Sequence, residues 1–365
     1  MKFTTNRKGI LSAINIANSA IGRGAIASLR CLMFKADGNG QITVTGSDGE
    51  VTVSRHTTID AMVDGGFLVD PAKLIPFLKG LNTDDVTFEF DDRQLKVTSG
   101  KVKSSFPVNN YEDYPVAQYG NSGEKFTSWT FNFGQFCAAL TYTMPAREQD
   151  SKSTVVTRNI HIVQSNGRCT VETTDTHHVH VYQIDSEGNQ DGEFVLAADV
   201  AKLIPSLSDD LSPKDDIEIN VKTGVMRIET ESMTIIAGTP SGTFPNTEKV
   251  IPKSFNAEWR FDGEDLSQAV QRAMPFNEVG KVNLTRTGGQ FAISSRGDNG
   301  EFVQDLDGDS GDDLDMSIYM SGRFLADAIK GMTTVRLQLV AERRPLVVTD
   351  MDNPRMMAVI APMGA

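Results

Sequence analysis

The sequence has few cysteines, no long apolar run and no recognisable secretion signal. Its cysteines are Cys31, Cys137 and Cys169, an odd and widely spaced set that fits neither a disulfide framework nor a zinc site. We therefore expect reduced thiols that are mostly buried. No apolar stretch approaches the length that crosses a bilayer, and the basic amino terminus lacks the apolar core and cleavage site of a signal peptide. These absences predict a soluble, cytoplasmic protein without a membrane partner.

Motifs typical of catalysis are also absent. The chain has no glycine-rich phosphate loop, no Gly-x-Ser-x-Gly elbow and no His-Glu-x-x-His helix, and no cysteine has a plausible base nearby in sequence. We therefore predict that the protein is not an enzyme and that it uses no cofactor.

Three histidines in one short segment are the main candidate for a metal site. In Thr174-Asp175-Thr176-His177-His178-Val179-His180, the spacing places His178 and His180 on the same side of a strand. No carboxylate or cysteine completes a convincing ligand set, so we favour a turn followed by a strand whose polar face carries the histidines, with no metal. A metal-assisted hydrolase that uses His177–His180 is a distant alternative; metal-free purified protein would exclude it.

An acidic run from Asp305 to Asp315 resembles the start of a calcium-binding loop, because aspartates occupy alternate positions. However, Ser310 stands where the sharp turn needs glycine, and Met316 stands where the bidentate glutamate belongs. We therefore predict a solvated hairpin connection, and leave open whether this run binds cations weakly.

An internal repeat indicates how the chain is divided. At 365 residues, the chain is long enough for two or three domains. Residues 67–81 reappear as residues 194–207, and both copies contain Ala-Lys-Leu-Ile-Pro; residues 318–332 form a more diverged third copy. Each copy predicts a strand that leads into a short amphipathic helix.

Strand patterns after each of these helices complete the repeating unit. Apolar and polar residues alternate in 85–90, 217–221 and 335–340, which is typical of strands with one buried face. We predict an α+β fold with helices on one face of antiparallel sheets. Head-to-tail pairing of two such chains would close a ring of six units. The expected tandem, similar domains span residues 1–120, 125–250 and 254–365.

The formal net charge of −13 would repel nucleic acid unless the basic side chains gather on one surface. Basic residues such as Lys73, Lys202 and Arg323 recur on or beside the predicted helices. The plain interpretation is solubility and pairing at helix ends. If equivalent helices face one way, these cations would instead line a concave surface and contact phosphates without reading bases.

The threefold plan, the Phe-Pro pairs at 106–107 and 244–245, and the tail 359–364 make the chain similar to the bacterial sliding clamps, the beta subunits of DNA polymerase III, and to their phage-encoded relatives. The resemblance covers essentially the whole chain and includes 1–4 and 111–115. It implies the DNA clamp fold and a homodimeric ring around duplex DNA, bound without sequence specificity. Such a ring is a processivity factor: it tethers the DNA polymerase, and a separate clamp loader places it on DNA.

The family's partner site is an apolar cleft between the second and third domains that captures short peptide motifs of the polymerase and loader. The family's usual glycine and arginine are Thr176 and His178 here, a leucine is Thr157, and the tail ends Ala361-Pro362-Met363-Gly364. We therefore expect a shallower, more polar cleft with a different peptide preference. The resemblance implies these cleft residues: Thr157, Thr174, Thr176, His177, His178, Val179, Pro245, Lys249, Val250, Ser321, Phe324, Pro345, Val359, Ala361, Pro362 and Met363.

The resemblance, together with the basic residues of the predicted helices, also suggests where DNA is contacted. The leading alternative is a clamp-like peptide-binding scaffold that does not encircle DNA, and the formation of a closed ring separates the two. The candidate DNA-binding residues are Arg23, Lys73, Lys79, Arg147, Lys152 and Lys202.

Overall fold

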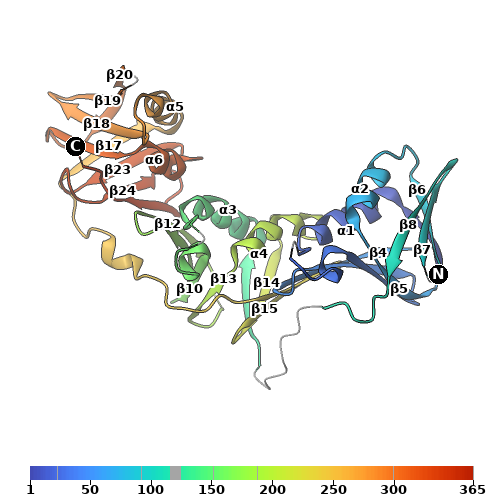
Figure 1. Ribbon diagram of the computed structural model, residues 1–365. Helices are drawn as coiled ribbons and strands as arrows, with labels where there is room; N and C mark the ends of the chain where they lie inside the picture. The colour runs from blue at the N-terminus through green and yellow to red at the C-terminus, as the bar shows by residue number, and fades with distance from the viewer. Residues whose placement is uncertain are drawn as a thin grey trace. The chain divides into compact units, whose positions relative to one another are not determined.

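The computed structural model describes residues 1–22, 24–91, 93–115, 125–150, 152–186, 188–298 and 300–364. The chain forms two compact units (Figure 1). Unit 1 comprises Met1–Gly134 and Asp199–Thr239, and unit 2 comprises Gln135–Ala198 and Pro240–Ala365. The middle predicted domain therefore contributes to both units, and its boundaries remain a prediction.

Unit 1 is built on a twelve-stranded antiparallel sheet in the order β1-β6-β7-β8-β5-β2-β3-β4-β16-β15-β14-β9. Its helices are α1 (Arg7–Asn18), α2 (Pro71–Lys79) and α4 (Ala198–Leu203), with the 3-10 helices η1 (Ser28–Arg30) and η4 (Ile204–Asp209). Its strands are β1 (Lys2–Asn6), β2 (Leu32–Asp37), β3 (Gln41–Ser47), β4 (Val51–Thr58), β5 (Asp64–Val69), β6 (Asp85–Asp91), β7 (Gln94–Ser99), β8 (Val102–Asn109), β9 (Thr127–Asn132), β14 (Asp216–Lys222), β15 (Val225–Glu229) and β16 (Met233–Gly238).

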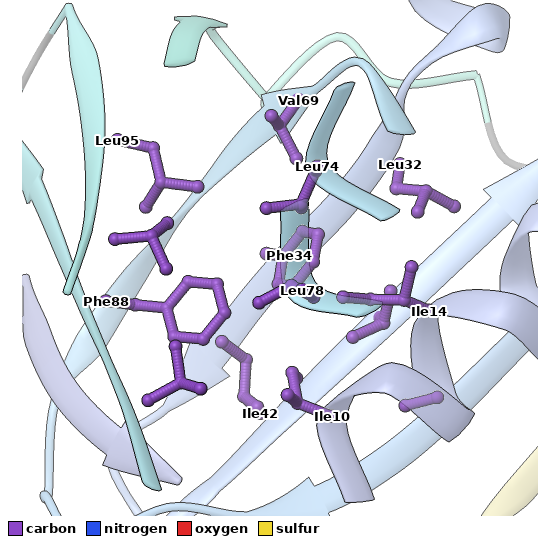
Figure 2. Close-up of a cluster of buried hydrophobic side chains, with 14 of the residues drawn as sticks. Ile10, Ile14, Leu32, Phe34, Ile42, Val69, Leu74, Leu78, Phe88 and Leu95 are labelled. Atoms are coloured by element: carbon purple, nitrogen blue, oxygen red, sulfur yellow. The ribbon is translucent and has the colours of Figure 1, made fainter. Parts of the chain in front are cut away.

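One core of unit 1, built from residues between Phe3 and Phe106, lies between this sheet and helices α1 and α2. Asn6 begins α1, because its side chain accepts hydrogen bonds from the backbone N–H groups of Lys8 and Gly9 at 3.0 and 3.2 Å. The helix packs against β3, β4 and α2, which buries one apolar stripe. Figure 2 shows the side chains that meet there, which include Ile10, Ile14, Phe34, Leu74, Leu78 and Phe88.

The repeated strand-then-helix pattern is confirmed locally, since β5 leads into α2, β13 (Gly192–Leu196) into α4, and β22 (Met316–Ser321) into α6 (Gly322–Ile329). The shared pentapeptide folds in two ways. Pro76 lies inside α2, whereas α4 stops just before Ile204-Pro205 and the chain continues as η4. A proline lacks the N–H that extends an α-helix; α2 accommodates Pro76, whereas the second copy continues as a 3-10 helix from Ile204.

Unit 2 contains a nine-stranded antiparallel sheet in the order β13-β10-β11-β12-β25-β24-β23-β17-β21 and a four-stranded sheet in the order β20-β19-β18-β22. Its other helices are α3 (Phe133–Thr143) and α5 (Gly263–Ala273), with the 3-10 helices η2 (Met144–Ala146), η3 (Val156–Arg158), η5 (Thr247–Val250) and η6 (Met274–Phe276). Its remaining strands are β10 (Ile160–Ser165), β11 (Arg168–Thr174), β12 (His178–Asp185), β17 (Ala257–Asp262), β18 (Lys281–Thr287), β19 (Gln290–Gly297), β20 (Gly300–Leu306), β21 (Gly308–Ser310), β23 (Thr334–Leu339), β24 (Leu346–Asp350) and β25 (Met356–Ile360).

Antiparallel sheets covered by helices confirm the predicted α+β class, and the three alternating segments lie in β6, β14 and β23. All three cysteines are free, with Cys31 and Cys169 buried. Within the described ranges, no helix is long and apolar enough to cross a membrane.

The acidic run 305–315 differs from the predicted plain hairpin connection. Its residues 308–310 form β21, which pairs with β17 at the edge of the larger sheet. Beyond β21, carboxylate oxygens of Asp313 and Asp315 lie 3.7 and 3.8 Å from guanidinium nitrogens of the buried Arg286. The run is therefore partly structural, because a buried guanidinium requires nearby negative charge.

Candidate peptide-binding cleft

The floor of the candidate cleft is a row of valines in unit 2. Strand β12 pairs with β25, so that Val179 lies opposite Val359, and β25 pairs with β24, so that Val359 lies opposite Val347. These side chains form one apolar cluster with Val181, and Ile251 packs against its edge. The pairing brings β12 together with the β24–β25 hairpin, which is far away in sequence.

The segment 244–251 borders this floor at Ile251, which packs against the valines. Phe244 is buried at one end, while Pro245, Lys249 and Val250 are exposed. Val250 is 47% exposed, so it offers an apolar contact to a partner.

A hydrogen-bonded network that sequence analysis missed fixes this segment. His161 is buried, with Nδ1 2.8 Å from Oε1 of Glu172 and Nε2 3.2 Å from Oε2 of Glu193. The Thr247 hydroxyl donates to the other oxygen of Glu172, and the Phe244 ring stacks on the His161 ring with centroids 4.5 Å apart. The network depends on the cross-strand register that places His161 opposite Glu172, which no local sequence signal indicates.

The turn before β12 is held by two side chains. Thr174 Oγ1 donates to the carbonyl of His178 at 2.7 Å and accepts from the N–H of Thr176 at 2.9 Å. One oxygen of Asp175 accepts from the N–H groups of His177 and His178, each at 2.8 Å. Thr176 therefore adopts a left-handed φ of 75°, which is unfavourable for a β-branched residue. This is the position where the family usually has glycine.

His178 and His180 lie on the same side of β12 as predicted, but the predicted polar face is wrong. Both side chains are buried. The Nδ1 of His180 donates to the carbonyl of Tyr142 at 2.8 Å, and its ring stacks on the Tyr142 ring. Burial lowers the pKa of His180 to about 4, so the ring is neutral near pH 7.

His178 is held between Asp175 and Phe324. Its Nδ1 lies 2.8 Å from Oδ1 of Asp175, and its ring stacks on Phe324. Burial raises the pKa of the Asp175 carboxyl, but hydrogen bonds and charge from His178 outweigh this and hold the pKa below its ordinary value. Among the residues that the structure describes, no group of three or more His, Cys, Asp or Glu side chains is placed to hold a metal.

The carboxyl-terminal residues and α6 complete the cleft. The N–H of Ala361 donates to the carbonyl of His177 at 2.9 Å, and the N–H of Met363 donates to that of Tyr319 at 2.7 Å. Pro362 lies between these bonds, half-buried like its two neighbours. Ser321 caps α6 by accepting from the N–H of Phe324 at 3.4 Å.

Thr157 and Pro345 are the remaining predicted cleft residues. Thr157 is buried in η3, and its hydroxyl is 3.0 Å from both the hydroxyl and the carbonyl oxygen of Thr154. It therefore does not add the open polar surface expected at that position. Pro345 is half-buried directly before β24.

The candidate DNA-binding residues are spread over both units. Lys73 and Lys79 are exposed on α2, and Lys152 is exposed in a loop. The Nζ of Lys202 lies 2.7 Å from Oδ1 of Asp199, so its charge is partly offset. Arg147 is half-buried. Arg23 lies outside the described residues, and a common DNA-facing surface remains a prediction.

Comparisons with known proteins agree with this architecture. The model of the DNA polymerase III beta subunit N-terminal domain matches residues 1–118, and the model of its C-terminal domain matches residues 248–364. The beta sliding clamp of Mycoplasma capricolum is 21% identical, with 99% of each chain covered. That of Streptococcus pneumoniae is 22% identical, with 99% of this chain and 98% of the relative covered.

A solved structure shows the same fold. The Bacillus subtilis DNA polymerase sliding clamp superposes with a TM-score of 0.91 at 16% identity, covering 100% of this chain and 99% of that one. The family is non-enzymatic, in agreement with the sequence prediction. The family models match both ends of the chain, and the relatives match its full length. The chain therefore belongs to the DNA polymerase III beta subunit family, the beta sliding clamps.

Proposed function

We propose that this chain is a processivity factor of DNA replication in the cytoplasm. Two copies form a ring around duplex DNA, and the cleft in unit 2 binds a short peptide motif of the polymerase or the clamp loader. The main support for this proposal is the candidate cleft. In it, the β12 turn, the segment 244–251, α6 and the chain's tail lie around an apolar floor.

The cleft suits a peptide with bulky apolar side chains. Val250 supplies exposed apolar surface beside the buried valine cluster, and backbone bonds anchor the half-buried Met363. A flexible methionine adapts to different partners. With His178 buried in place of the family's arginine, the cleft has one fewer cation for an acidic peptide residue.

Two free strand edges support closure into a homodimer. Among the described residues, the stretch 102–107 of β8 pairs only with β7, and β20 pairs only with β19. Lys101 and Lys103 make the first edge basic, whereas Glu301 and Asp305 make the second acidic. Edges of opposite charge on one chain favour head-to-tail pairing with a second copy.

A ring that encircles DNA needs only weak phosphate contacts, because topology retains it. Exposed lysines such as Lys73 on α2 can supply these contacts. Tethering the polymerase raises its local concentration at the primer end without chemistry by the clamp.

The direct test is the assembly state, measured by mass photometry and electron microscopy of the full chain. A closed particle of two 39.8 kDa chains that, once loaded, stays on circular DNA and leaves when the DNA is cut would support the proposal. In the matched variant Lys101→Glu with Lys103→Glu, the dimer should dissociate, whereas Lys35→Glu with Lys214→Glu should leave it intact. A wild-type monomer that still binds a polymerase tail peptide would instead support the scaffold that does not encircle DNA.

A further inference from the structure

A polar pocket of about 380 Å³ lies on the four-stranded sheet of unit 2. The alternation in β18 buries Val282 and Leu284 in the core and leaves Lys281 and Asn283 on the opposite face. The pocket therefore opens away from the core of its sheet. The side chains that matter for its chemistry are Lys281, Asn283, Ser294, Arg296, Glu301 and Tyr319.

The pocket carries more positive than negative charge. Lys281 places Nζ 5.3 Å from the centre of the Tyr319 ring, and Arg296 is exposed. Arg296 lies opposite Glu301 in the strand register, yet no ion pair joins them within the described part of the chain. Asn283 accepts from Ser317 at Oδ1, at 2.9 Å, which leaves its amide N–H groups as donors. Two cations with neutral donors suit a carboxylate.

Residues of the pocket lie next to residues of the candidate cleft. Lys281 lies opposite Ser321, the residue that caps α6 in the cleft. The Tyr319 carbonyl accepts the bond from Met363, and Nζ of Lys281 lies 3.4 Å from the carbonyl oxygen of Gly364. A peptide that leaves the cleft along the chain's tail would therefore reach Lys281 first.

We propose that this pocket is an additional subsite that binds a carboxylate of the partner peptide, beyond the apolar residues that occupy the cleft. The carboxylate is either an acidic side chain or the peptide's own carboxyl terminus. The inference rests on the proposed function, because it requires the peptide to lie in the cleft. The pocket would also supply a cationic contact to the peptide, since this clamp has His178 in its cleft where the family usually has arginine.

The experiment measures fluorescence anisotropy of a labelled tail peptide from a bacterial replicative polymerase with the full-length protein. Three forms are compared: one extended by two asparagines and amidated, one extended by two aspartates and amidated, and the asparagine form with a free carboxyl terminus. For the wild type, we expect one of the two acidic forms to bind about three- to tenfold more tightly than the neutral form, and the gain to shrink with salt.

In the double variant Lys281→Gln with Arg296→Gln, this gain should disappear while the neutral form binds within about twofold of its wild-type affinity. The control Lys35→Gln with Lys214→Gln removes two exposed charges from unit 1 and should keep the gain.

If the neutral peptide does not bind the wild type, the proposed cleft function fails. If it binds but acidic forms gain nothing, or the gain survives in the double variant, the subsite is wrong. A double variant that loses retention on DNA but keeps the peptide gain would place the pocket on the DNA-facing surface and also overturn the inference.

Discussion

The imidazole of His178 lies nearly flat on the ring of Phe324, with centroids 3.9 Å apart and planes 15° apart. The stack joins the β12 turn to α6. Asp175 fixes the imidazole from one side, and the Ser321 cap fixes the first turn of the helix that carries Phe324. The orientation of the β12 turn relative to α6 therefore depends on this pair.

Removing the Phe324 ring should weaken partner binding. Phe324→Ala exposes the buried face of His178 and removes an apolar surface, so we expect at least about a tenfold loss of affinity for the polymerase tail peptide. Phe324→Tyr retains the ring and should bind within about threefold of the wild type. Anisotropy titrations check both, and equal affinity for all three proteins would contradict a role for the stack.

Thr176→Gly should stabilise the protein. The residue adopts φ 75°, where glycine fits without the steric cost of a β-branched side chain, so we expect about 1 kcal/mol more free energy of unfolding. Urea denaturation measures this change. The control Thr285→Gly lies in strand β18 and should lose about 1 kcal/mol. If both variants lose stability equally, the turn is not strained.

His180 should make stability depend on pH. Its pKa is lowered to about 4 by burial, below the ordinary value, so the unfolded chain binds its proton first as pH falls. Stability is therefore lost from about pH 6.5 downward and the loss is complete below about pH 4, roughly 3 kcal/mol at most. The lowered pKa of Asp175 acts in the same direction.

His180→Asn isolates the contribution of His180. Asparagine can still donate to the Tyr142 carbonyl but does not titrate in this range. Urea denaturation at pH values from 4 to 7 should show a shallower pH dependence for the variant than for the wild type. Parallel curves for the two proteins would argue against a buried neutral histidine.

Glu172 should position the segment 244–251 without touching the peptide. Glu172→Gln weakens the bonds to His161 and Thr247, so the exposed Val250 moves relative to the valine floor and peptide affinity should fall about tenfold. Glu193→Gln changes only the exposed partner of His161 and should have little effect. A purely structural role of Glu172 would lower stability at unchanged affinity, which anisotropy and urea denaturation distinguish.

Charge reversal on the helices tests DNA contact. Lys73→Glu should weaken salt-sensitive retention on nicked circular DNA more than Lys202→Glu does, because Asp199 already offsets the charge of Lys202. Lys214→Glu, an exposed control, should match the wild type. Retention by all three variants at wild-type levels would count against these lysines as DNA contacts.

Local sequence patterns predicted several elements of the fold. Alternation over 85–90, 217–221 and 335–340 predicted β6, β14 and β23, and the repeated pentapeptide predicted a helix after a strand. These features are local because side-chain periodicity directly reflects which face of one element is buried. The sequence also indicated that His178 and His180 share one side of a strand, but not that this side is buried.

Only the tertiary structure decided how the cleft is held. The His161–Glu172 pair follows from the register of β10 and β11, the burial of His178 and His180 follows from Phe324 and Tyr142, and β21 forms because β17 offers a free edge. Each contact joins residues that are distant in sequence or depends on one register among several. Periodicity within a single segment carries no information about its partner, whereas packing the whole chain selects the one arrangement that satisfies the buried polar groups.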